Sequence, residues 1–77
     1  MNDQIHFDST DTALLRRLMK EHGDSQFPFF GTNEDGETIE ISISRDGIVL
    51  RTFQSNGWIR KNYFDKDGYL EGETFEK

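Results

Sequence analysis

Residues 34–68 read EDGETIEISISRDGIVLRTFQSNGWIRKNYFDKDG, and four turn triplets divide this stretch into nearly equal parts. Each triplet ends in a glycine, at Gly36, Gly47, Gly57 and Gly68, in steps of 11, 10 and 11 residues. A step of this length holds one strand and one tight turn. Asp-Gly or Asn-Gly between alternating apolar residues is the strongest short-range signal for a hairpin. The stretch therefore predicts an antiparallel β-meander.

The apolar alternation around these turns indicates where the strands lie. We expect strands at about residues 26–31, 38–44, 48–54, 58–64 and 69–75. Pro28 lacks a backbone N–H, so the first of these strands is expected at an edge of the sheet or in an irregular form.

A helix is predicted before the sheet, over about residues 10–22. Asp8 or Ser9 can cap its first turn. Its apolar stripe at helical spacing consists of Leu14, Leu15, Leu18 and Met19. Because a helix of three to four turns is marginal on its own, this stripe must dock on the sheet. The predicted fold class is α+β, with one N-terminal helix packed on an antiparallel meander of four to five short strands.

Length and composition limit the kind of protein this is. The 77 residues form a single small domain, in which residues 1–8 are a tail or a short edge strand and residues 26–75 form the meander. The absence of cysteine excludes disulfides and favours the cytosol. The longest apolar run, Ile48-Val49-Leu50, is far too short for a bilayer. We therefore expect a cytoplasmic protein that does not enter a membrane.

The charge is unevenly distributed. Fifteen acidic and nine basic residues give a net charge of −6, which disfavours attraction to nucleic acid or to an anionic membrane. One acidic cluster lies at residues 34–40 and a second in the C-terminal hairpin at residues 65–76. Four bases lie between the clusters, namely Arg45, Arg51, Arg60 and Lys61.

Two-residue turns would assign the side chains to faces, since residues opposed across a hairpin share a side. The face expected to pack on the helix collects Ile39, Ile41, Ile43, Ile48, Leu50, Ile59 and Tyr63. The opposite face collects Arg51, Phe53, Trp58, Arg60, Phe64 and, opposite Arg60, Phe75. Aromatic residues and arginine dominate interface hot spots, so these six residues form the predicted binding site. Two alternatives stay open: a G1 bulge at one turn, or curling toward a barrel, would move some of the rings into the core.

Catalytic and metal motifs do not emerge from the sequence. The only histidines, His6 and His22, are separated by the predicted helix and have no Cys, Ser nucleophile or convincing carboxylate partner. Asp65-Lys66-Asp67-Gly68 is similar to the start of a calcium loop, but Tyr69 and Leu70 follow where oxygen ligands are needed. We expect no catalytic residue, no metal and no cofactor, and a protein that is not an enzyme.

One segment resembles known proteins. The stretch from Ser55 to Phe75 contains Tyr63-Phe64-Asp65-Lys66-Asp67-Gly68 followed by Gly72-Glu73 and a further aromatic residue. This pattern resembles the hairpin repeats of MORN-type proteins. The Asn-Gly-Trp strand and the acidic, aromatic hairpin are also similar to those of small uncharacterised proteins carried on mobile elements of Firmicutes. Both resemblances imply a protein-contact or accessory role, and neither implies a catalytic residue.

Two classes of function follow. The first is a non-enzymatic protein-binding accessory or inhibitor protein of a mobile element or phage, which uses the aromatic and arginine face and selects a basic partner with its acidic hairpins. The second is a self-associating structural module, dimeric through the aromatic face or an edge strand. A third hypothesis, single-stranded nucleic-acid binding by the basic and aromatic residues, conflicts with the net charge.

Overall fold

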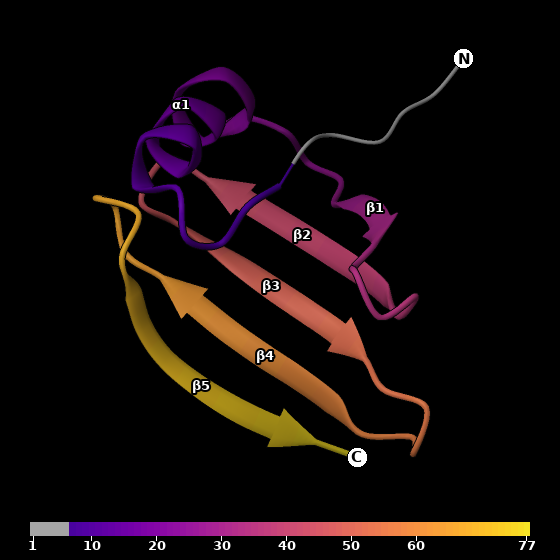
Figure 1. Cartoon of the computed structure of the whole chain (residues 1–77). Coiled ribbons are helices and arrows are strands. Elements are labelled where there is room, and N and C mark those ends of the chain that lie inside the picture. Colours follow the sequence, from indigo (N-terminus) through magenta and orange to yellow (C-terminus); the bar gives the residue numbers. More distant parts are fainter. Residues whose placement is uncertain (1–6) are drawn as a thin grey trace.

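The computed structural model describes residues 7–77, which form one helix and one five-stranded sheet (Figure 1). The elements are α1 (Thr12–His22), β1 (Phe29–Thr32), β2 (Thr38–Ser44), β3 (Gly47–Phe53), β4 (Ile59–Phe64) and β5 (Leu70–Glu76). The strands pair antiparallel in the order β1-β2-β3-β4-β5, which confirms the predicted α+β fold with a meander. β1 is an edge strand that begins directly after Pro28, as expected. The expected tail or edge strand at residues 1–8 lies largely outside the described residues.

The helix begins later than predicted. Its N-cap is Asp11, whose side chain accepts a hydrogen bond from the N–H of Leu14 at 3.0 Å. The expected cap Asp8 instead accepts from the backbone N–H and the hydroxyl of Thr10, at 2.9 and 2.7 Å. The prediction of Asp8 or Ser9 as the cap is therefore wrong, because Asp8 stabilises a separate turn that leads into the helix.

The helix crosses one end of the sheet (Figure 1). Near its start, Arg16 Nη1 donates to the carbonyl oxygen of Asp67 in the β4–β5 turn, at 3.1 Å. Just beyond its end, Asp24 accepts from Nε of Arg45 in the β2–β3 turn, at 2.9 Å. This hydrogen bond and the charge of Arg45 lower the pKa of the exposed Asp24 carboxyl. The helix is thus hydrogen-bonded near both ends to turns that lie at the same end of the strands.

The sheet face toward α1 is built from cross-strand rows. The row beneath the helix contains Ile43, Ile48 and Phe64, the middle row Ile41, Leu50 and Asn62, and the far row Ile39, Thr52, Arg60 and Phe75. The four apolar residues of the helical stripe are buried against the isoleucines and Phe64. The core therefore lies at the helix-covered end, and the far row is left for other parts of the chain to cover.

The β3–β4 pairing differs by one residue from the predicted register. Leu50 lies opposite Asn62 instead of Tyr63. In the loop, Gly57 has a φ of 89°, its N–H donates to the carbonyl of Gln54 at 3.1 Å, and the N–H of Gln54 donates to the carbonyl of Trp58 at 2.9 Å. These bonds define a three-residue loop with a G1 bulge, the alternative that the sequence left open. A shift of one residue moves every side chain of β4 to the other face.

The consequences are largest for Phe64 and Tyr63. Phe64, expected on the face away from the helix, is only 5% exposed and packs edge-on against Phe7, with ring centroids 6.1 Å apart. Tyr63 and Ile59, expected under the helix, lie on the opposite face. Phe75 does lie opposite Arg60, because a shift between Tyr63 and Phe64 restores the predicted register along β5.

Candidate functional site

The six predicted binding residues do not share one face. Arg51 and Phe53 lie on the face away from the helix, whereas Arg60 and Phe75 lie on the helix side and Phe64 is in the core. Trp58 precedes β4 and is 39% exposed, with Lys77 Nζ 5.6 Å from its ring centroid. The prediction of a single aromatic patch on one face is therefore wrong. The structure instead has two separate candidate surfaces.

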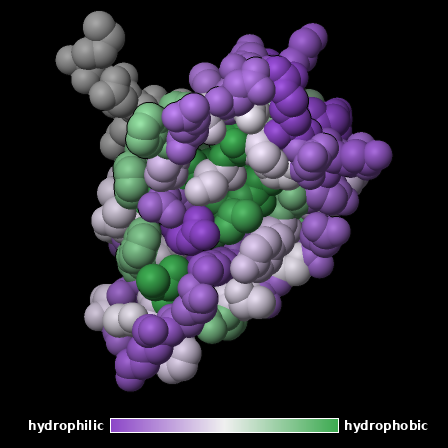
Figure 2. Space-filling model, turned by 180° about the vertical axis from the view of Figure 1, so that it is seen from behind, coloured by the Kyte–Doolittle hydropathy of each residue, from purple (hydrophilic) through white to green (hydrophobic). Residues whose placement is uncertain are grey.

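The first surface is the outer face, the side of the sheet away from α1. It is defined by three pairs opposed across β3 and β4: Phe53 with Ile59, Arg51 with Lys61, and Val49 with Tyr63. Phe53 is 36% exposed, and the other five residues are half-buried. Figure 2 shows this side of the molecule, with apolar side chains gathered in the middle and polar side chains around them. No element of the described chain covers it.

The charges of the outer face are paired within the sheet. Arg51 Nη1 lies 3.2 Å from Glu40 Oε1 on β2 and also donates to the hydroxyl of Ser42 at 3.3 Å. Lys61 Nζ lies 2.6 Å from Glu76 Oε1 on β5. Arg51 and Lys61 are directly opposite one another, a destabilising arrangement for like charges that these two acids offset. The outer face is consequently apolar and close to neutral, although the chain carries −6.

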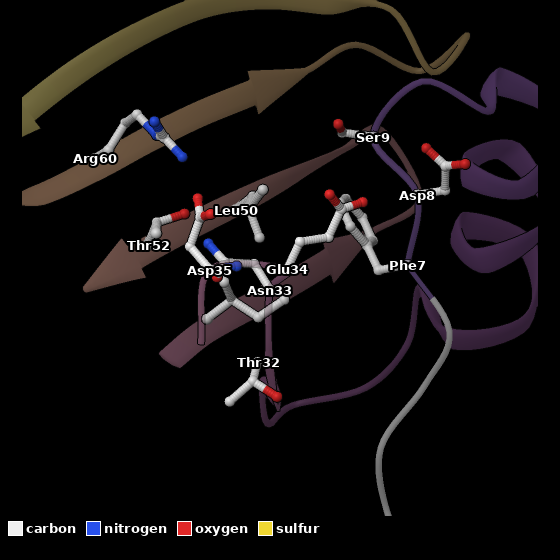
Figure 3. A pocket seen from close by; sticks show the side chains of 11 residues that line it. Phe7, Asp8, Ser9, Thr32, Asn33, Glu34, Asp35, Leu50, Thr52 and Arg60 are labelled. Atoms are coloured by element: carbon white, nitrogen blue, oxygen red, sulfur yellow. Dashed lines mark hydrogen bonds between the residues drawn. The ribbon is translucent and has the colours of Figure 1, made fainter. Parts of the chain in front are cut away.

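The second surface is a pocket of about 520 Å³ on the helix side, over the far row of the sheet (Figure 3). Leu50, Ile39 and Thr52 line it from the sheet, and Arg60 enters it from β4. The segment before α1 contributes Phe7, Asp8 and Ser9, and the β1–β2 region contributes Thr32, Asn33, Glu34 and Asp35. The pocket exists because α1 covers only the opposite end of this face.

The loop between β1 and β2 is held rigidly beside the pocket by one asparagine. Asn33 Oδ1 accepts from the backbone N–H groups of Asp35 and Glu37, at 3.0 and 2.9 Å. Its Nδ2 donates to Glu37 Oε1 at 3.0 Å, and Gly36 closes the turn with a φ of 78°. These hydrogen bonds define the backbone conformation of the loop that carries Glu34 and Asp35.

Arg60 is the least satisfied polar residue of the pocket. Its Nε is buried without a hydrogen-bond partner, and its guanidinium forms no ion pair within residues 7–77. Its neighbour across the sheet, Thr52, is 1% exposed and is the buried polar residue of the core. The sequence pattern predicted Arg60 as a binding residue but on the opposite face of the sheet, and it contains no indication of the pocket.

Within the part of the chain that the structure describes, no three His, Cys, Asp or Glu residues lie close enough to hold a metal ion. The His22 ring packs edge-on against Phe29, with centroids 5.1 Å apart. Asp65 Oδ1 accepts from the N–H groups of Asp67 and Tyr69, at 2.9 and 3.0 Å, so its carboxylate stabilises the β4–β5 turn. Neither residue is placed as a ligand or an acid–base catalyst.

The chain was compared with family models, curated proteins and solved structures. No family model, curated protein or solved structure matches the chain. Among residues 7–77, no helix has the length and apolar character that crossing a membrane requires.

Proposed function

We propose that this chain is a non-enzymatic protein-binding protein, an accessory or inhibitor that docks a partner on its outer face. The supporting observation is the uncovered apolar surface formed by Phe53, Ile59 and Val49, whose neighbouring charges are already paired. An exposed apolar area rimmed by polar residues is typical of a protein interaction site. The ion pairs hold Arg51 and Lys61 in place, so docking does not have to order these long side chains.

A different protein suits this face better than a second copy does. The net charge of −6 makes two copies repel one another. The free edge of β5 carries Glu71, Glu73 and Glu76, and an antiparallel β5–β5 contact would bring these carboxylates together. The other edge, β1, offers only four residues. Pairing of two copies is therefore disfavoured by like charge along β5 and by the short length of β1.

The expected partner has an apolar centre with basic residues around it. Asp46 and Glu71 line a hollow together with Val49 and Tyr63 of the outer face, form no ion pair among the described residues, and can attract such a rim. Nucleic acid is a poorer candidate, because phosphates would have to displace Glu40 from Arg51 and Glu76 from Lys61. Complementary charge of this kind mainly raises the association rate and selects between partners.

Replacing Phe53 with glutamine tests the outer face. We expect the free protein to sediment as a monomer, and Phe53→Gln to weaken capture of the partner from cell lysate about 30-fold or more, since truncating an interface hot spot costs about 2 kcal/mol or more. The matched control is Phe27→Gln, which changes an equally apolar but 77% exposed ring outside the sheet. It should leave capture unchanged. Equal capture by both variants, or a dimer that Phe53→Gln dissociates, would contradict the proposal.

A further inference from the structure

The outer face contains a hollow of about 270 Å³, at the end of the strands that α1 covers on the opposite face. Val49 and Tyr63 of the outer face line it, together with Asp46 from the β2–β3 turn and Glu71 from β5. Pockets for small molecules usually measure about 300–1,000 Å³. This hollow is smaller, so it suits one long side chain of a docked protein better than a complete small molecule.

The two acids of the hollow have no partner within residues 7–77. The carboxylates of Asp46 and Glu71 form no ion pair and accept no hydrogen bond there, and none of the residues that line the hollow is basic. Glu71 has no partner on β4, because the register of β5 shifts by one residue between Tyr63 and Phe64. Bulges of this kind redirect a side chain. The hollow is therefore the negative part of an outer face whose other charges are paired.

A long cationic side chain is the group that this lining fits. Its charge complements the carboxylates of Asp46 and Glu71, and its methylene stem can contact Val49 and the ring of Tyr63. Arginine fits better than lysine, because a guanidinium is weakly hydrated, stacks on aromatic rings and has five donors for two carboxylates. A metal ion fits poorly, since no third ligand residue joins the two acids within the described chain.

We infer that the partner of the outer face inserts one arginine side chain into this hollow. The guanidinium lies against Tyr63 and pairs with Asp46 and Glu71, while apolar residues of the partner cover Phe53 and Ile59 at the other end of β3 and β4. Arginine is among the residues that most often dominate the binding energy of an interface. The inference rests on the proposed function, because the arginine belongs to the protein that docks on this face.

Titration of the isotope-labelled full chain with N-acetyl-L-arginine amide, followed by amide chemical shifts, tests the hollow without the partner. The shifts should be confined to the residues around the hollow, among them Gly47, Tyr63 and Glu71, and should saturate with a Kd of about 1–10 mM. N-acetyl-L-citrulline amide has the same length but no charge, so it should bind at least about 10-fold more weakly. N-acetyl-L-lysine amide should bind with intermediate strength.

Charge-removing variants identify the groups that hold the probe. Glu71→Gln and Asp46→Asn should each weaken binding of the arginine probe about 3- to 10-fold, the effect of losing one charged acceptor. The matched control is Glu73→Gln, which removes the same charge from β5 on the helix side of the sheet and should leave binding unchanged. No saturating shifts at about 50 mM, equal binding of the citrulline probe, or an equal loss in Glu73→Gln would overturn the inference.

The arginine hollow and the docking proposal fail in different ways. Phe53 does not line the hollow, so Phe53→Gln should leave binding of the arginine probe unchanged. Loss of probe binding in the unmodified chain would overturn the hollow alone. Equal capture of the partner by Phe53→Gln and Phe27→Gln, with probe binding intact, would overturn docking on the outer face.

Discussion

Phe64→Ala is expected to lower the stability of this protein by about 3–5 kcal/mol, because it deletes a large ring from the centre of the core. A chain of this length has about 4–12 kcal/mol in total, so the variant should retain little of it. The Phe64 ring is enclosed by Phe7, the helical stripe and Ile48, and the chain around it cannot collapse fully into the space left behind. The thermal midpoint should fall by at least about 12 °C.

Phe53→Ala is the matched control, since it removes the same ring from the outer face. It should cost no more than about 1 kcal/mol, because Phe53 is 36% exposed and no element within residues 7–77 covers it. Circular dichroism melts of the two variants measure the difference. Similar losses, or a larger loss for Phe53→Ala, would mean that the outer face is not the free surface of this protein.

Gly68→Ala is expected to have the second largest effect, because Gly68 meets the helix as well as forming a turn. Its φ is 89°, in the region that side chains rarely adopt. An added Cβ would lie 2.8 Å from the carbonyl oxygen of Thr12 and 3.3 Å from Cβ of Leu15. Backbone strain of about 1 kcal/mol and overpacking of about 1–3 kcal/mol should both act against the folded state.

Gly57→Ala separates these two causes. Gly57 has the same φ of 89°, but a Cβ there would meet nothing within 4 Å. This variant should therefore lose only about 1 kcal/mol, from the backbone term alone. Urea denaturation of both variants should place the midpoint of Gly68→Ala clearly below that of Gly57→Ala. Equal midpoints would show that α1 does not rest on the β4–β5 turn.

The arrangement of the elements could be predicted because it depends on local signals. Glycines at regular steps with Asp or Asn before them mark the hairpins, and the stripe formed by Leu14, Leu15, Leu18 and Met19 marks the buried side of the helix. These signals act over a few residues, so the structure retains them whatever the packing elsewhere.

The binding residues on β4 and β5 could not be placed because their faces depend on one residue of loop length, whereas Arg51 and Phe53 on β3 lie on the predicted face. Asn56-Gly57 suits a two-residue turn and equally a three-residue loop with Gly57 in the bulge. The structure adopts the second, and Arg60 and Phe64 consequently change sides. The pocket was missed for a different reason, since it depends on where α1 stops along the strands and on how the β1–β2 loop bends, neither of which has a local sequence signal.

Nuclear Overhauser contacts across the β3–β4 hairpin would test the strand register on which the outer face and the Arg60 pocket both depend. In antiparallel strands the closest α-protons belong to the pairs without hydrogen bonds. The bulged loop makes these pairs Arg51 with Lys61 and Val49 with Tyr63, so strong contacts between their α-protons are expected. Contacts of Leu50 with Tyr63 and of Thr52 with Lys61 would instead show a two-residue turn, and would contradict the outer face and the Arg60 pocket together.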